Sequence, residues 1–236
     1  MDPLAKLVAD RYARRTIQFD QRAIQLKGAE LAEEAIRKIR KVGWPSRPID
    51  EQFDPAEIFA SGTLQVRSVL GEEKTLKVNV WGRPAGGHQP TAGGDFNKTY
   101  NIINLYLDTD WTPEALELAK NQVIRRFSSN LVHEVTHALD VFGDQYVGFG
   151  VDREKYYNQP VEFRAYSKQI ITEALGAIPK LKRLKWRGKA PPLYKVVEDL
   201  LENSDTFKRM GQLFDRSNQN RLRQMLVREV QDLGLL

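Results

Sequence analysis

The sequence predicts an α+β fold, in which a small sheet of three or four strands packs on a helix that carries an HExxH motif. Two observations support this prediction. Apolar and polar residues alternate in segments between positions 64 and 107, as is typical of strands. Before and after this region, apolar residues recur three and four positions apart, as is typical of amphipathic helices. We expect an N-terminal helical arm (1–48), a core (49–178), and a C-terminal part (179–236) with a basic segment and further helices.

The N-terminal arm is predicted to form one or two helices between residue 3 and about residue 42. Pro3 suits a first helical turn, and leucine, isoleucine and alanine residues follow at helical spacing. Gly28 is expected to break the helix, and the turn-forming sequence GWPSRP at 43–48 ends the arm. We interpret the arm as a helical cap on the core. The alternative is a docking arm for a partner or an inhibitory segment.

Three strands are predicted next. Residues 64–70 and 76–80 alternate in polarity, and GEEKT at 71–75 lies between them, which indicates a hairpin. Residues 100–107, with the sequence YNIINLYL, form a third strand that we expect to be largely buried.

A segment rich in glycine and proline, residues 82–95, separates the hairpin from the third strand. It is expected to be a loop rather than regular structure. It contains His88, which we interpret as a solvated loop residue. The alternative is a further metal ligand or a substrate contact.

The longest predicted helix begins at Thr112-Pro113 and runs to Gly143, because a capping hydroxyl precedes a proline in the first turn. It carries His133-Glu134-Val135-Thr136-His137, which holds two of the three histidines of the chain. Side chains four positions apart on a helix lie on one face, so both imidazoles can reach one ion. The carboxylate of Glu134 would then lie beside the ion, where it can deprotonate a metal-bound water. The pattern is typical of zinc hydrolases.

A catalytic zinc ion usually has a third protein ligand, and Glu162 is our candidate. It falls in the first turn of a helix that starts at Pro160, and 24 residues separate it from His137, which lets the chain reverse direction. A carboxylate at a helix N-terminus is also stabilised by the helix dipole without any metal. The rival carboxylates that we consider less suitable are Asp144, Asp152, Glu154 and Glu173.

Two further residues are candidates for supporting roles. Asp140 follows His137 by three positions on the same helical face, so it can accept a hydrogen bond from a metal-bound imidazole. A surface role for this aspartate is the alternative. Tyr166 lies one turn after Glu162 and could stabilise a tetrahedral oxyanion, a role for which Tyr156 and Tyr157 compete. Each tyrosine could instead be a core or rim aromatic.

The motif resembles that of the gluzincin zinc metallopeptidases, whose thermolysin-like members carry a nearly identical HExTHA segment. The resemblance covers roughly residues 105–175. It implies that His133, His137 and Glu162 are zinc ligands and that Glu134 is the general base. The chain departs from thermolysin at Tyr166, where those enzymes have an aspartate that orients a histidine ligand. The pattern around Glu162 is more similar to that of small intracellular or phage-associated metallopeptidases.

A basic segment follows the predicted Glu162 helix. It interleaves cations with leucine and tryptophan, which suits a strand-like segment or a solvated basic loop. It is also a signal for binding to nucleic acid or another anionic surface. The cations are Lys180, Lys182, Arg183, Lys185, Arg187 and Lys189. Two helices, at about 193–203 and 205–233, are predicted to end the chain.

Composition limits the remaining possibilities. The 236 residues include no cysteine, so disulfides and thiolate zinc sites are excluded. The net charge of +5 is a mild basic bias. No stretch suits a membrane span, and Met1–Lys6 lacks the features of a secretory signal. We therefore expect a cytoplasmic or phage- or virion-associated protein.

The function expected from these observations is hydrolysis of a protein or peptide substrate by a zinc metalloendopeptidase. The alternative is a non-enzymatic binding protein, either a particle component or a nucleic-acid-associated protein, that uses the basic segment at 180–189. A third possibility combines the two, with a protease brought to its target by that segment.

Overall fold

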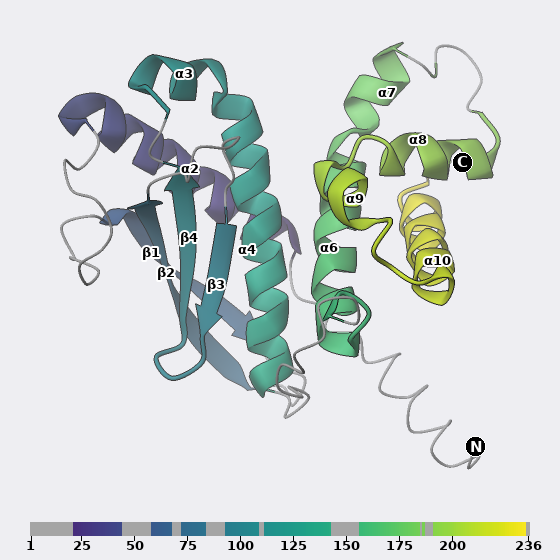
Figure 1. The fold of residues 1–236 in the computed structure, drawn as a ribbon, viewed down its shortest axis with the longest axis horizontal. Coiled ribbons are helices and arrows are strands. Elements are labelled where there is room, and N and C mark those ends of the chain that lie inside the picture. Colours follow the sequence, from purple (N-terminus) through teal and green to yellow (C-terminus); the bar gives the residue numbers. More distant parts are fainter. Residues whose placement is uncertain are drawn as a thin grey trace. The chain divides into compact units, whose positions relative to one another are not determined.

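The computed structural model describes residues 21–43, 58–67, 72–83, 93–108, 111–142, 156–184, 186 and 191–234. They form the predicted α+β fold, with one four-stranded sheet and helices before and after it (Figure 1).

The chain divides into two compact units, residues 1–146 and 147–236. The first contains α2 (Gln21–Val42), β1 (Ile58–Arg67), β2 (Glu73–Arg83), β3 (Gly93–Asn97), β4 (Ile102–Asp108), α3 (Pro113–Leu118) and α4 (Lys120–Phe142). The second contains α6 (Pro160–Gly176), α7 (Ile178–Leu184), α8 (Leu193–Leu201), α9 (Asp205–Met210) and α10 (Arg216–Asp232). The division differs from the predicted boundaries at 48 and 178, because α2 packs with the sheet and α6 packs with the C-terminal helices.

The sheet has the strand order β1-β2-β4-β3. β1 and β2 form the predicted hairpin, β2 and β4 run parallel, and β3 pairs with β4 in the antiparallel direction. The apolar residues of the alternating pattern, such as Val78, Val80 and Leu105, are completely buried. The prediction of a loop throughout 82–95 was wrong at both ends, because β2 extends to Arg83 and β3 begins at Gly93. His88 lies outside the described residues.

Two helices cover the sheet. α2 packs on β1 and on α4, and α4 packs on β3 and β4 (Figure 1). The prediction that Gly28 breaks the first helix was wrong, since α2 is continuous from Gln21 to Val42. A Cβ atom on Gly28 would lie 2.8 Å from the Cα atom of Ser128. This glycine therefore permits close contact between α2 and α4.

The predicted helix from Thr112 to Gly143 is two helices, α3 and α4. Thr112 caps α3 as expected, because its hydroxyl accepts a hydrogen bond from the amide of Ala115 at 3.2 Å. The backbone turns at Ala119, whose φ and ψ angles are −91° and 5°, and α4 begins at the next residue. The motif remains within one uninterrupted helix.

The second unit packs its helices around a separate apolar core, which includes Phe163, Ile170, Leu200 and Leu226. The prediction of one helix over 205–233 was wrong. The chain forms α9 and then α10, and the side chain of Asp215 caps α10 by accepting a hydrogen bond from the amide of Asn218 at 2.7 Å.

The basic segment begins as a helix, not as the strand-like segment or loop that its alternation suggested. α7 exposes Lys180, Lys182 and Arg183 and buries Leu181. Beyond α7, the indole Nε1 of the half-buried Trp186 donates to a carboxylate oxygen of Asp199 at 3.0 Å. Lys185, Arg187 and Lys189 lie outside the described residues. None of the helices that the structure describes has the length and apolar character needed to cross a membrane.

Candidate metal and catalytic site

The histidines of the HExxH motif lie together near the C-terminal end of α4. The Nε2 atoms of His133 and His137 are 3.0 Å apart, and the ring centroids are 4.7 Å apart with the ring planes at 80°. Both side chains are nearly buried, with relative exposures of 8% and 9%. Two imidazoles bound to a tetrahedral zinc ion at about 2.05 Å have nitrogen atoms roughly 3.3 Å apart. The observed separation is therefore close to that of a shared metal ion.

Glu134 is also buried, at 6% exposure, and its side chain lies between the backbones of α4 and β3. Its carboxylate approaches the backbone of Gly94 on β3, near enough that a side chain at that position would contact it. A carboxylate is one of the groups that can transfer a proton in general acid–base catalysis.

Asp140 is 1% exposed, which rules out the surface role that the sequence left open. Its position in α4 places it three residues after His137 within the same buried stretch, residues 131–140. Buried carboxylates are retained where charges or hydrogen bonds compensate for lost hydration. A role in orienting a histidine of the motif stays a prediction.

Glu162 belongs to the second unit and lies where the sequence predicted, in the first turn of α6. Pro160 is the first residue of this helix, and Gln159 occupies the N-cap position, although its side chain does not cap the helix. Glu162 is 2% exposed, so it is not a solvated helix-terminal carboxylate.

Tyr166 lies one turn after Glu162 and is half-buried. Its ring centroid is 5.6 Å from that of Tyr157, which in turn lies 5.1 Å from that of Tyr156. The three tyrosines that competed for the oxyanion role thus form one aromatic cluster. The contribution of Tyr166 to catalysis stays a prediction.

The rival carboxylate on the same helix, Glu173, has a different role. It accepts hydrogen bonds from the hydroxyl of Ser204 at 2.8 Å and from the hydroxyl and amide of Thr206 at 2.7 and 2.9 Å. These bonds hold the beginning of α9 against α6. The other rivals, Asp144, Asp152 and Glu154, lie outside the described residues.

The sequence prediction missed a chain of polar side chains on the sheet, which includes Asp95, the residue after Gly94. The indole of Trp81 donates to Asn104 at 2.8 Å, Asn104 donates to Asp95 at 3.0 Å, and the hydroxyl of Tyr106 also donates to Asp95. These side chains come from β2, β4 and β3. The pattern was hidden because Asp95 follows two glycines in a segment that was predicted to be a loop.

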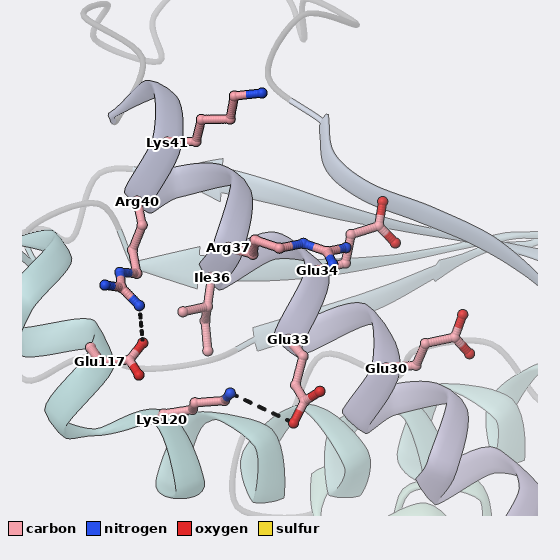
Figure 2. Close-up of a pocket in the computed structure, with 9 residues that line it drawn as sticks. All are labelled: Glu30, Glu33, Glu34, Ile36, Arg37, Arg40, Lys41, Glu117 and Lys120. Atoms are coloured by element: carbon pink, nitrogen blue, oxygen red, sulfur yellow. Dashed lines mark hydrogen bonds and ion pairs between the residues drawn. The ribbon is translucent and has the colours of Figure 1, made fainter.

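A surface hollow in the first unit is a separate feature (Figure 2). Four acidic and four basic side chains line it with Ile36, and the pairs Arg40–Glu117 and Lys120–Glu33, at 3.3 and 3.8 Å, connect α2 to α3 and α4. Lys120 begins α4, so the hollow is about 20 Å from the motif along the helix. Its balanced charges and its position make it a salt-bridged surface apart from the motif.

No protein-family model matches the chain, and comparisons with curated proteins and solved structures found no significant similarity. The assignment of chemistry therefore depends on the residues of this chain.

Proposed function

We propose that the chain is a zinc-dependent metallopeptidase of the gluzincin type. The observation that carries the proposal is the pair of nearly buried imidazoles on α4, with Nε2 atoms 3.0 Å apart and the buried Glu134 next to one of them. Nitrogen and carboxylate donors are the set that zinc takes in catalytic sites without cysteine. Because the chain has no cysteine, it cannot form the thiolate sites of structural zinc proteins.

The proposed ligands are His133, His137 and Glu162. Two imidazoles and a carboxylate are donor types that can hold a metal ion in a catalytic site. Glu162 comes from the second unit, so its coordination of the ion is part of the proposal. When bound, zinc would lower the pKa of a coordinated water and polarise a substrate carbonyl.

The residues of the chain supply the remaining steps. Glu134 would accept the proton of the attacking water and return it to the leaving amine, as a general base and then a general acid. β3 has only β4 as a neighbour among the described strands and lies beside α4. Its outer edge therefore presents backbone groups to which an extended peptide can pair, which favours a protein or peptide substrate.

The test of the base is Glu134→Gln, which keeps the shape of the side chain and removes its basicity. We expect unchanged zinc content and a loss of kcat of at least about 10²-fold, measured by mass spectrometry on a peptide library. Glu117→Gln is the matched control, because Glu117 is half-exposed on α3, and it should retain full activity. Undiminished hydrolysis by Glu134→Gln would refute the mechanism.

The test of the third ligand is the zinc content of Glu162→Gln. We expect weaker zinc binding in this variant, because the carboxylate ligand is replaced by a neutral amide. Glu173→Gln, a change of the rival carboxylate on the same helix, should leave zinc binding as it is. Equal zinc affinity in Glu162→Gln and the unaltered chain would exclude Glu162 as a ligand.

A second candidate function is binding of nucleic acid by the second unit. Residues 147–236 contain seventeen lysines and arginines against eleven acidic residues, whereas residues 1–146 contain nineteen against twenty. The positive charge of the chain is thus concentrated in the second unit. α7 exposes Lys180, Lys182 and Arg183 on a helix that Leu181 anchors in the core.

This second function predicts DNA binding that weakens steeply with salt, because cations displace counterions from phosphates. Replacing the three exposed cations of α7 with glutamine should reduce both the affinity and the salt dependence. DNA binding that is unaffected by these substitutions, or the absence of binding at low salt, would exclude α7 as a nucleic-acid site.

A further inference from the structure

We infer that Gly94 is a positioning residue for Glu134, because the missing side chain at this position leaves the space that the Glu134 carboxylate occupies. The inference rests on the proposed function, in which Glu134 is the base. It adds a residue on another element, the edge strand β3, to the groups that determine where the base lies.

The strand register brings Gly94 to α4. Gly94 pairs with Leu105 of β4, and directly opposed residues of antiparallel strands share one face of the sheet. Leu105 is completely buried in the core that α4 shares with the sheet. Any side chain at position 94 would therefore point from the sheet toward α4.

The space at that point is too small for a methyl group. A Cβ atom on Gly94 would lie 3.0 Å from Cγ and 3.1 Å from Oε1 of Glu134. Carbon atoms in contact are ordinarily about 3.5–4.0 Å apart. An alanine would thus displace the carboxylate by several tenths of an ångström, or move the strand.

Glycine is not needed here for its backbone freedom. The described glycines with positive φ are Gly43 and Gly234, and Gly94 is not among them. Any residue could adopt its extended conformation, so the absence of a side chain is the property that matters at position 94.

The polar chain on the opposite face keeps β3 from moving away. Asp95, the next residue, accepts hydrogen bonds from Asn104 and Tyr106 of β4, and Asn104 accepts one from Trp81 of β2. The five-residue edge strand is thus tied by side chains as well as by its backbone pairing. A methyl group at position 94 would therefore act mainly on Glu134.

The kinetic test is Gly94→Ala in the zinc-loaded full chain, with a peptide that the unaltered enzyme cleaves. We expect kcat to fall on the order of tenfold with KM nearly unchanged, because misplacing a catalytic group by a fraction of an ångström slows the reacting step. Zinc content should not change. Gly176→Ala is the matched control, since a Cβ there meets nothing within 4 Å, and its kcat should equal that of the unaltered enzyme.

A second readout needs no activity and no metal. Melting temperatures of the chelator-treated chain are compared for Gly94→Ala, Glu134→Ala, the double variant and the unaltered chain. We expect Gly94→Ala to lower the melting temperature more in the presence of Glu134 than in its absence, because Glu134→Ala removes the atoms that the new methyl group would meet. A Gly94→Ala chain that folds only when combined with Glu134→Ala would support the same conclusion.

The two readouts separate the inference from the proposed function. If the unaltered chain cleaves no peptide, the proposed function fails, and the melting temperatures still decide whether Gly94 determines the position of Glu134. Equal changes in melting temperature with and without Glu134 would overturn the inference. So would an unchanged kcat in Gly94→Ala.

Discussion

The close contact between α2 and the motif helix can be tested with Gly28→Ala. A Cβ on Gly28 would lie 2.8 Å from the Cα and 3.2 Å from the amide nitrogen of Ser128. Both are backbone atoms, so they cannot rotate away as a flexible side chain could. The hydroxyl of Ser128 also donates to the carbonyl oxygen of Gln25 at 3.0 Å, and this bond depends on the same close approach.

The expected change in the free energy of unfolding combines two destabilising contributions and one stabilising contribution. Inserting a methyl group into a packed contact costs roughly 2 kcal/mol, within the usual range of about 1–3 kcal/mol. Losing the hydrogen bond between Ser128 and Gln25 costs about 1 kcal/mol. Alanine in a helix interior is more favourable than glycine by about 1 kcal/mol. We therefore expect Gly28→Ala to lower the free energy of unfolding by about 2 kcal/mol.

Urea denaturation monitored by far-UV circular dichroism measures this change. Gly176→Ala is the control, because a Cβ at that position meets nothing within 4 Å, and it should be neutral or stabilising by at most about 1 kcal/mol. If Gly28→Ala stabilised the chain as Gly176→Ala does, α2 would not pack on α4 in the way described. The alternative interpretation of the N-terminal arm, as a docking arm for a partner, would then be favoured.

Two further predictions concern the proposed metal ion and the second unit. Zinc at 100 times its dissociation constant should raise the free energy of unfolding by about 2.7 kcal/mol, and His137→Ala should abolish most of this gain in calorimetry; an equal gain in both chains would exclude His137 as a ligand. Glu173→Ala should cost about 3 kcal/mol in urea denaturation, because it leaves the buried donors of Ser204 and Thr206 without their charged acceptor. A loss below about 0.5 kcal/mol would show that this carboxylate does not hold α9.

Local sequence signals predicted the elements whose causes are local. Alternating polarity predicts the β1–β2 hairpin, because the apolar positions of both strands are buried. Thr112 and Pro113 predict the start of a helix, because capping involves residues within one turn. The pairing of His133 and His137 follows from helical periodicity alone.

The failures at Gly28 and Gly94 have the opposite character, since each of these glycines contacts a residue that is distant in the sequence. Gly28 was interpreted as a helix break and Gly94 as part of a loop. Glycine indicates such irregular structure when only the residues adjacent in the sequence are considered. In the structure, both lie inside regular elements, where β4 pairs with β3 and the core supports α2. The role of each glycine depends on the atoms that it contacts in the folded chain. Composition and periodicity give no information about these contacts.

Both glycines contact the same helix, α4. Gly28 of α2 approaches Ser128, and Gly94 of β3 approaches Glu134 six residues later on α4. A helix that must hold two histidines and a base in one geometry gains from neighbours that approach its backbone closely, because close packing leaves little room for it to shift. Two of the positions at which the sequence prediction failed are therefore positions at which other elements of the first unit contact the motif helix closely.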